Sequence, residues 1–232
     1  MARRSVRNGG GALTAAVAVL LGATACSASQ PQRQSTPDEL ASRAMERIRT
    51  APSVRVRLER TGSEAMRVDL RVDRGGSCTG RIISADGAAD VIKVRKEFWL
   101  KPDEALWKAQ FGGGSAAPPP FKDRYLHGST RDEQLSDTAS LCDLAGLHRT
   151  LAREVGSGPF AGSDPVDVDG RQAETASGKD NAVQISMAGR GEPIRILQHG
   201  EGTVTATFTD RGKPVHATAP PPERSVDLDR LR

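Results

Sequence analysis

The 232-residue sequence is poor in the residues on which most catalytic and metal sites depend. It contains only four histidines and three cysteines, and aromatic residues make up 3% of it. The histidines are scattered and form no His-x-x-x-His pair that could hold zinc. No Gly-x-Ser-x-Gly or Ser-x-x-Lys nucleophile motif is present, and no glycine run lies between a strand and a helix as a phosphate-binding loop requires. We therefore expect a non-catalytic protein with no metal or cofactor.

Charge and hydropathy exclude two further classes. The sequence has 33 Lys and Arg residues against 29 Asp and Glu residues, and residues 1–25 hold three arginines and no acid, which leaves 30 against 29. No basic tract like those of nucleic-acid-binding proteins is present, so we expect no nucleic-acid partner. Beyond residue 25, no apolar run approaches the roughly 20 residues that a membrane-spanning helix needs.

The first 26 residues have the layout of an export signal. Arg3, Arg4 and Arg7 form a basic start, residues 12–21 are apolar, and the small residues Ala23-Thr24-Ala25 precede Cys26. A cysteine in this place resembles the lipobox of bacterial lipoproteins. The alternative is an ordinary secretory signal followed by an incidental cysteine, and the route of export (general secretory or twin-arginine) stays open.

The lipobox resemblance implies that residues 1–25 are a lipoprotein signal peptide and that Cys26 becomes the acylated N-terminus of the mature chain. Acyl chains such as palmitate would then hold the protein, since each buried methylene contributes about 0.8 kcal/mol. Residues 26–36, rich in Ser, Gln and Pro, are typical of a flexible tether. The expected location is the extracytoplasmic face of the cell membrane, with a lipid anchor.

Export also bears on the two remaining cysteines, Cys78 and Cys142. They are 64 positions apart, and an oxidising compartment favours a disulfide between them. The alternative is two separate buried thiols.

Hydrophobic periodicity predicts alternating blocks of helix and strand. Thr36, Pro37 and Glu39 are typical of a capping box at the start of an amphipathic helix over residues 37–50. A period of two then predicts strands over 54–59, 66–73, 78–84, 90–95 and 97–101, separated by short turns. We expect a short helix over 102–110 and a helical period over 132–155. Further strands are predicted over 165–168, 171–176, 181–188, 193–199, 202–209 and 213–218.

This order predicts an α+β fold in a single domain over residues 37–228. Strand blocks separated by helices favour one large antiparallel sheet with helices on one face. We expect a monomer.

The same order, together with the lipobox, resembles the LppX/LprA/LprF/LprG group of actinobacterial lipoproteins, which share the LolA/LolB-like fold. The similar stretches are the hairpin over 54–73, the segments Val91-Ile92-Lys93-Val94 and Glu97-Phe98-Trp99-Leu100-Lys101 with Ala105-Leu106-Trp107, and the closing stretch over 207–215. The cysteine pair is not a general feature of that group.

The resemblance implies an incomplete antiparallel β-barrel of about 10–11 strands, with amphipathic helices covering its concave face. The apolar cavity on that face, lidded by the helices, would carry acylated lipids, glycolipids or the acyl chains of lipoproteins. The candidate lining residues are Val54, Val56, Leu58, Val68, Leu70, Leu144 and Leu151. Each of these residue types suits an ordinary packed core equally well, and packing is also the commoner role for Trp99 and Trp107. Two functions therefore compete: lipid binding or transfer at the membrane, and a non-catalytic interaction, accessory or sensor module with a filled core. An envelope structural protein is a third.

Overall fold

The computed structural model describes residues 35–179, 182–189 and 191–231. The expected signal peptide, Cys26 and most of the expected tether lie outside the described residues. The helices are α1 (Pro37–Thr50), α2 (Glu104–Leu106), the π-helical turn η1 (Trp107–Phe111), α3 (Ser136–Ser140), α4 (Leu144–Val155) and the 3-10 turns η3 (Pro222–Arg224) and η4 (Leu228–Leu231). The strands are β1 (Ser53–Arg60), β2 (Met66–Asp73), β3 (Ser77–Ser84), β4 (Gly87–Val94), β5 (Glu97–Pro102), β6 (Tyr125–Ser129), β7 (Ala161–Val168), β8 (Arg171–Ser177), β9 (Val183–Ala188), β10 (Ile194–His199), β11 (Thr203–Thr209) and β12 (Ser225–Asp227).

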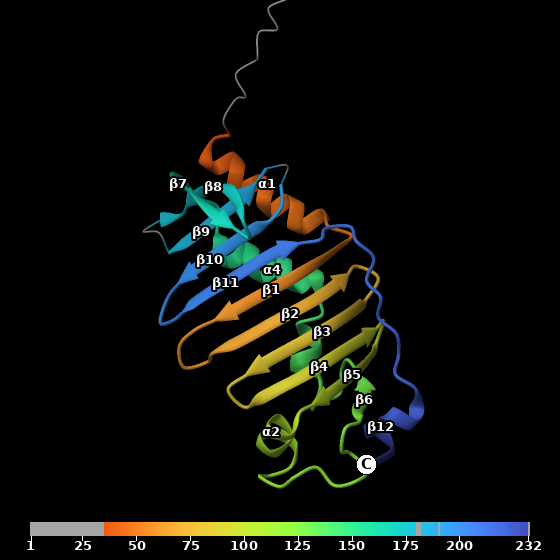
Figure 1. Ribbon diagram of the computed structural model, residues 1–232. Coiled ribbons are helices and arrows are strands. Elements are labelled where there is room, and N and C mark those ends of the chain that lie inside the picture. The colour runs from red at the N-terminus through yellow and green to blue at the C-terminus, as the bar shows by residue number, and fades with distance from the viewer. Residues whose placement is uncertain (1–34, 180–181, 190, 232) are drawn as a thin grey trace, which may run out of the picture. The chain divides into compact units, whose positions relative to one another are not determined.

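All 12 strands belong to one sheet, in the order β12-β6-β5-β4-β3-β2-β1-β11-β10-β9-β8-β7. Each neighbouring pair is antiparallel except β12 and β6, which run parallel. The pairing of β1 with β11 joins the first strand to the C-terminal block, with Val56 opposite Phe208. The sheet does not close, and β12 and β7 are its two edges (Figure 1). The predicted α+β class and open antiparallel sheet are confirmed.

One predicted strand is absent from the described residues, and two observed strands were not predicted. The expected strand over 213–218 is wrong, because a strand after the turn at Asp210 and Gly212 would need a free edge of β11, and β1 and β10 occupy both edges. Residues 213–221 instead run without sheet pairing to η3 and β12 (Figure 1). The sequence prediction also missed β6 and β12, which are five and three residues long. Segments this short carry too little alternation to be recognised.

The N-terminal helix forms as its capping residues predict. Thr36 Oγ1 accepts from the Glu39 amide at 3.2 Å, and the Thr36 amide donates to Glu39 Oε2 at 2.9 Å. These two bonds satisfy amides that the first helical turn leaves without partners. The buried residues Leu40, Ala41, Ala44 and Ile48 form one stripe, which packs on the sheet.

The predicted helical segment over 132–155 is broken into two helices. Helix α3 ends at Ser140, and α4 begins after Asp143, whose extended backbone and side-chain bond to the Ala145 amide make it the N-cap of α4. Cys142 lies in the break and is tied to β3 by the disulfide to Cys78. The backbone of Asp143 is extended, so α3 and α4 are separate helices joined by the segment that holds Cys142.

Helices α1 and α4 lie on the same face of the sheet, behind it in Figure 1. We call this the covered face, defined by the inward residues Val56, Leu70 and Val91. We call the opposite side the charged face, defined by Arg55, Asp69 and Arg81. The main hydrophobic core lies between the covered face and the helices.

Candidate functional site

A row of nine paired positions crosses the covered face, and apolar side chains from eight strands fill it on either side of one glycine. Residues directly opposite in antiparallel strands point to the same side of a sheet, so the register identifies the row. It runs through Met187, Ile194, Phe208, Val56, Leu70, Gly80, Val91, Leu100 and Leu126. All of these except Gly80 belong to the core cluster. The sequence alternation therefore placed a wide apolar surface on one face, and that surface needs a cover.

The two helices cover this surface differently. Helix α1 approaches β8 and β9 closely, because Ala41 and Ala44 at its buried stripe are small. Helix α4 packs beside α1, and no strand comes comparably close to it. Its apolar residues Leu147 and Leu151 are only partly buried, although both face the core. The cover is thus tight under α1 and looser under α4.

The seven candidate lining residues all lie in this region. Val54, Val56, Val68, Leu70 and Leu144 are buried, whereas Leu58 and Leu151 are partly buried, and all seven belong to one core cluster. The surface of the described residues includes five hollows, and none of the seven candidates lines any of them. In this structure their side chains pack against each other and against the helices.

The disulfide between Cys78 and Cys142 is present, as the sequence predicted. It joins Cys78 on β3 to Cys142, two residues before α4 begins, and both cysteines are buried. Lys93 on β4 reinforces the same point, because its Nζ donates to the Cys142 carbonyl oxygen at 3.0 Å. The N-terminal end of α4 is therefore fixed to the sheet by one covalent and one polar contact.

Two hollows flank the C-terminal half of α4. The first, which we call the mouth hollow, has about 430 Å³ and is lined by residues 60–64, 154, 198–202 and 204. The second, the interhelical groove, has about 270 Å³ and is lined by residues of α1, α4 and the segment after α4, including Met45, Ala152 and Phe160. Glu154 borders the mouth hollow, and Ala152 and Val155 border the groove.

The mouth hollow opens onto the covered face. Arg60, Val204 and Gln198 lie opposite one another on β1, β11 and β10, two positions beyond Leu58, Ala206 and Ile196, so they point to the same side as the core. The sequence analysis missed this site. The sequence did contain a signal. Arg60 stands at a position of β1 whose side chain points to the covered face, after Val54, Val56 and Leu58 at the preceding inward positions. Lys93 likewise stands at an inward position of β4.

The two tryptophans lie in different parts of the domain. Trp107 is buried beside Phe111 and Phe121, with ring centroids 5.7 and 5.1 Å away, and it belongs to the core cluster. Trp99 lies on the charged side and stacks on His127 at 4.7 Å. Both are chiefly packing residues, although Trp107 also lines a hollow of about 280 Å³ near α2.

The histidines do not come together. His127 contacts Glu97 at 2.9 Å, while His148 lies on α4 at the interhelical groove. Burial lowers the pKa of His148, and the positive charges of Arg49 and Arg74 lower it further.

Across the described residues, no three His, Cys, Asp or Glu side chains lie close enough together to hold a metal ion. Among the same residues, no helix combines the length and apolar character needed to cross a bilayer.

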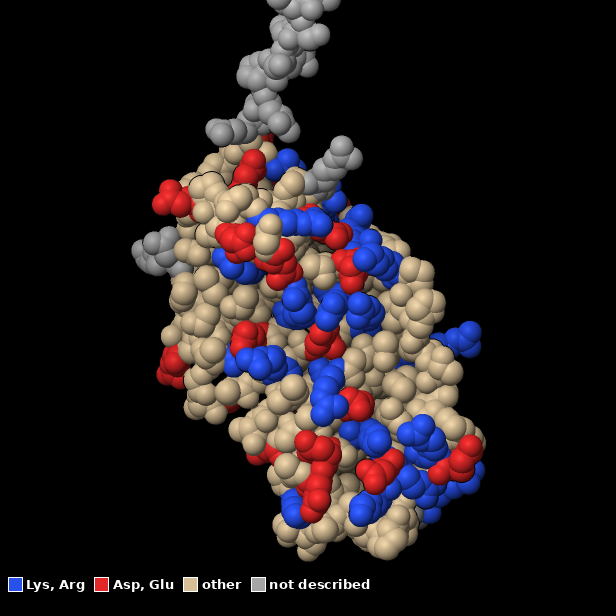
Figure 2. All heavy atoms as spheres, in the orientation of Figure 1, with Lys and Arg blue, Asp and Glu red and all other residues tan. Residues whose placement is uncertain are grey.

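The opposite face of the sheet carries most of the ion pairs. Figure 2 shows basic and acidic side chains interspersed over this face. Arg55 holds Asp69 through two bonds of 2.8 and 2.5 Å, and this contact lowers the pKa of the Asp69 carboxyl. The Arg81–Asp90 pair crosses β3 and β4 at 2.6 Å. Because these pairs are partly exposed and nearly balanced in charge, the face stabilises the sheet without presenting a field of one sign.

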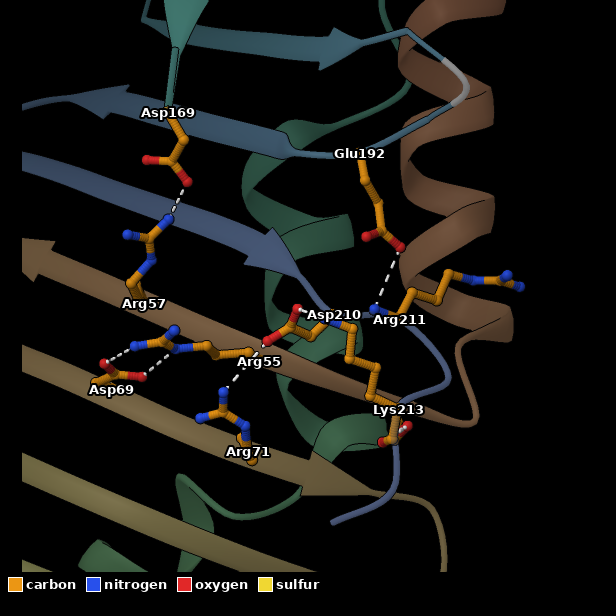
Figure 3. Close-up of polar contacts among 10 residues, drawn as sticks. Arg55, Arg57, Asp69, Arg71, Asp169, Glu192, Asp210, Arg211 and Lys213 are labelled. Carbon is orange, nitrogen blue, oxygen red and sulfur yellow. Dashed lines mark hydrogen bonds and ion pairs between the residues drawn. The ribbon is translucent and has the colours of Figure 1, made fainter. Parts of the chain in front are cut away.

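Two of these pairs connect distant segments (Figure 3). Asp169, at the β7–β8 turn, contacts Arg57 on β1. Asp210, at the end of β11, lies 3.3 Å from Arg71 on β2 and 2.6 Å from Lys213. The pairs therefore fix the β7–β8 turn and the start of the C-terminal segment against the middle of the sheet.

Comparison with known proteins gives a structural relationship only. No protein-family model and no curated protein sequence matches the chain. The crystal structure of LprF from Mycobacterium bovis superposes with a TM-score of 0.54 at 14% identity, covering 79% of this chain and 96% of LprF. The Mycobacterium tuberculosis lipoprotein LppX is similar with a TM-score of 0.48 at 13% identity, covering 78% of this chain and 98% of LppX. The chain has the fold of LprF, as the order of its helices and strands predicted.

Proposed function

We propose that this chain is a non-catalytic, extracytoplasmic lipoprotein, anchored through acyl chains on Cys26, that holds the acyl chains of a lipid or glycolipid between α4 and the covered face. One observation carries the proposal: a wide apolar face is covered tightly by α1 and loosely by α4, with hollows on both sides of the C-terminal half of α4. The fold shared with LprF supports it. An apolar surface under a loosely packed helix suits an acyl chain.

Lipid binding is tested by native mass spectrometry of the full chain purified gently from membranes. The expected result is a population heavier than the protein by the mass of one acylated lipid, which exchanges with lipid added in vesicles. A protein that carries and takes up no lipid in any detergent or vesicle would contradict the proposal.

Anchoring is a separate claim with its own test. The Cys26→Ala variant should leave the membrane fraction, while its folded domain unfolds at the temperature of the wild type. A variant that stays with the membranes after a high-salt wash would contradict a lipid anchor at Cys26.

A second function is an interaction, accessory or sensor module with a filled core. It is favoured by the packing of all seven candidate lining residues into one core cluster, away from the hollows. This function predicts no exchangeable lipid and a protein partner that can be cross-linked to the chain in intact membranes. The mass measurement above separates the two.

A further inference from the structure

Helix α4 is held to the rest of the domain unequally along its length. At its N-terminal end, Cys142 is bonded to Cys78 and its carbonyl accepts from Lys93 at 3.0 Å. Asp143 caps the helix through the Ala145 amide at 3.0 Å, and Leu144 is buried. This end cannot leave β3 while the disulfide is intact.

The C-terminal half has few such contacts. Ala152, Arg153 and Glu154 are exposed, Leu151 is partly buried against the core, and Val155 is buried in it. The helix stops at Gly156, whose φ of 69° favours glycine, and residues 157–159 after it are exposed. The side-chain bond that joins this half to the sheet is from Gln198 Nε2 to Glu154 Oε2, at 2.8 Å and open to solvent.

The same half borders both hollows described above. The mouth hollow separates Glu154 from the ends of β1 and β11, and the interhelical groove separates Ala152 from α1. Outward movement of this half would therefore break one exposed hydrogen bond and the packing of Leu151 and Val155. It would uncover the apolar side chains of Leu58 and Val68, which continue the covered face inward from Arg60.

We infer that acyl ligands enter at the mouth hollow, beneath the C-terminal half of α4, and that this half swings outward about its disulfide-bonded N-terminal end. The inference rests on the proposed function and adds the place and the moving part. The hollow also suits the polar end of such a ligand. Arg60 lines the hollow, and its Nη1 donates to Glu64 Oε2 at 2.7 Å, whereas its Nε is buried with no partner among the described residues. A ligand hydroxyl or ester oxygen that reached Nε would satisfy this donor.

The test fixes the moving end. In the full chain carrying Cys26→Ala, Glu154→Cys and Gln198→Cys place two thiols across the exposed bond, and a short bis-maleimide joins them. The matched control is the same variant with both thiols capped by N-ethylmaleimide, which alters the side chains without linking them. The measured quantity is the rate at which each form takes up pyrene-labelled diacylglycerol from phosphatidylcholine vesicles.

We expect the linked form to load at least tenfold more slowly than the capped form, which carries maleimide adducts on the same two thiols but no link between them. Equal rates in the linked and capped forms would overturn the inference and leave the proposed function intact. If the parent takes up no probe from any vesicle, the proposed function fails and the inference fails with it.

Hydrogen exchange gives a readout that needs no lipid. In the wild type, the amides of residues 152–155 should exchange at least tenfold faster than those of residues 147–150, although both groups lie in one helix. Uniform protection along α4 would mean that the helix opens as a whole or not at all, which contradicts a fixed N-terminal end.

Discussion

Removal of the disulfide is the sharpest test of how the helical cover is attached to the sheet. The perturbation is Cys78→Ala together with Cys142→Ala. The bond closes a loop with a sequence separation of 64, and in the chain-entropy description a loop of this length stabilises the folded state by about 4 kcal/mol at 25 °C. For a domain of this size, each kcal/mol shifts Tm by about 2–4 °C, so we expect a fall of roughly 10 °C.

The assay is urea and thermal unfolding of the full chain, followed by circular dichroism. Two further results should accompany the loss of stability. The urea m-value should rise, because an unfolded chain without the cross-link is more expanded and exposes more surface. The amides of residues 144–147 should also lose protection in hydrogen exchange, since Lys93 alone then holds the start of α4.

Wild type treated with a reductant is the matched control, because it loses the bond without any substitution. It should fall in stability by nearly the same amount as the double variant. The reasoning would be refuted if both forms unfolded within about 3 °C of the oxidised wild type. That result would mean that packing around the buried Cys142, and not the covalent loop, sets the stability at this point.

Four other substitutions probe the core, the charged face and the sheet. Leu70→Ala, at a position 1% exposed, should lower the free energy of unfolding in urea by about 3 kcal/mol. Leu151→Ala, in the loosely packed α4, should lower it by about 1 kcal/mol. Equal losses would contradict the looser cover. Asp69→Asn should cost at most about 1 kcal/mol at pH 7, because the pair with Arg55 is partly exposed. Since that pair lowers the folded-state pKa of Asp69, its contribution is present above pH 4 and is lost as the pH falls through that lowered pKa, so the stability difference between wild type and variant should shrink steadily as the pH falls below 4. Gly80→Ala would place a Cβ 2.0 Å from the Asp69 carbonyl oxygen, so we expect a loss of at least about 2 kcal/mol and faster exchange of the β2–β3 amides, and a neutral result would refute the close approach.

Local signals in the sequence predicted the elements that depend on neighbouring residues. The Thr36–Glu39 capping box predicted the start of α1, because both of its bonds join residues three positions apart. The alternation of Val54, Val56 and Leu58 with charged residues predicted which side of β1 faces the core. The cysteine pair was predicted because only two cysteines follow the expected export signal.

The candidate site was only partly predictable. The apolar character of the covered face follows from alternation, but the mouth hollow depends on Arg60, Glu154 and Gln198, which are far apart in the sequence. Arg60 could have been noticed as a charge in an apolar phase. Its neighbours could not, because the register between β1, β11 and β10 decides which side chains meet at the end of the sheet.

The sequence by itself determined the class of fold, the helix and strand periods, and the absence of a recognisable catalytic motif, since each follows from residue types and short spacings. Tertiary structure alone decided where the strands lie. It placed β11 beside β1, which left no edge for a strand over 213–218 and sent that segment on to pair β12 with β6. It also broke the helical period around Cys142, where the extended backbone of Asp143 separates α3 from α4 and the disulfide ties Cys142 to β3. Edge availability and long-range contacts are properties of the assembled sheet, and no local pattern encodes them.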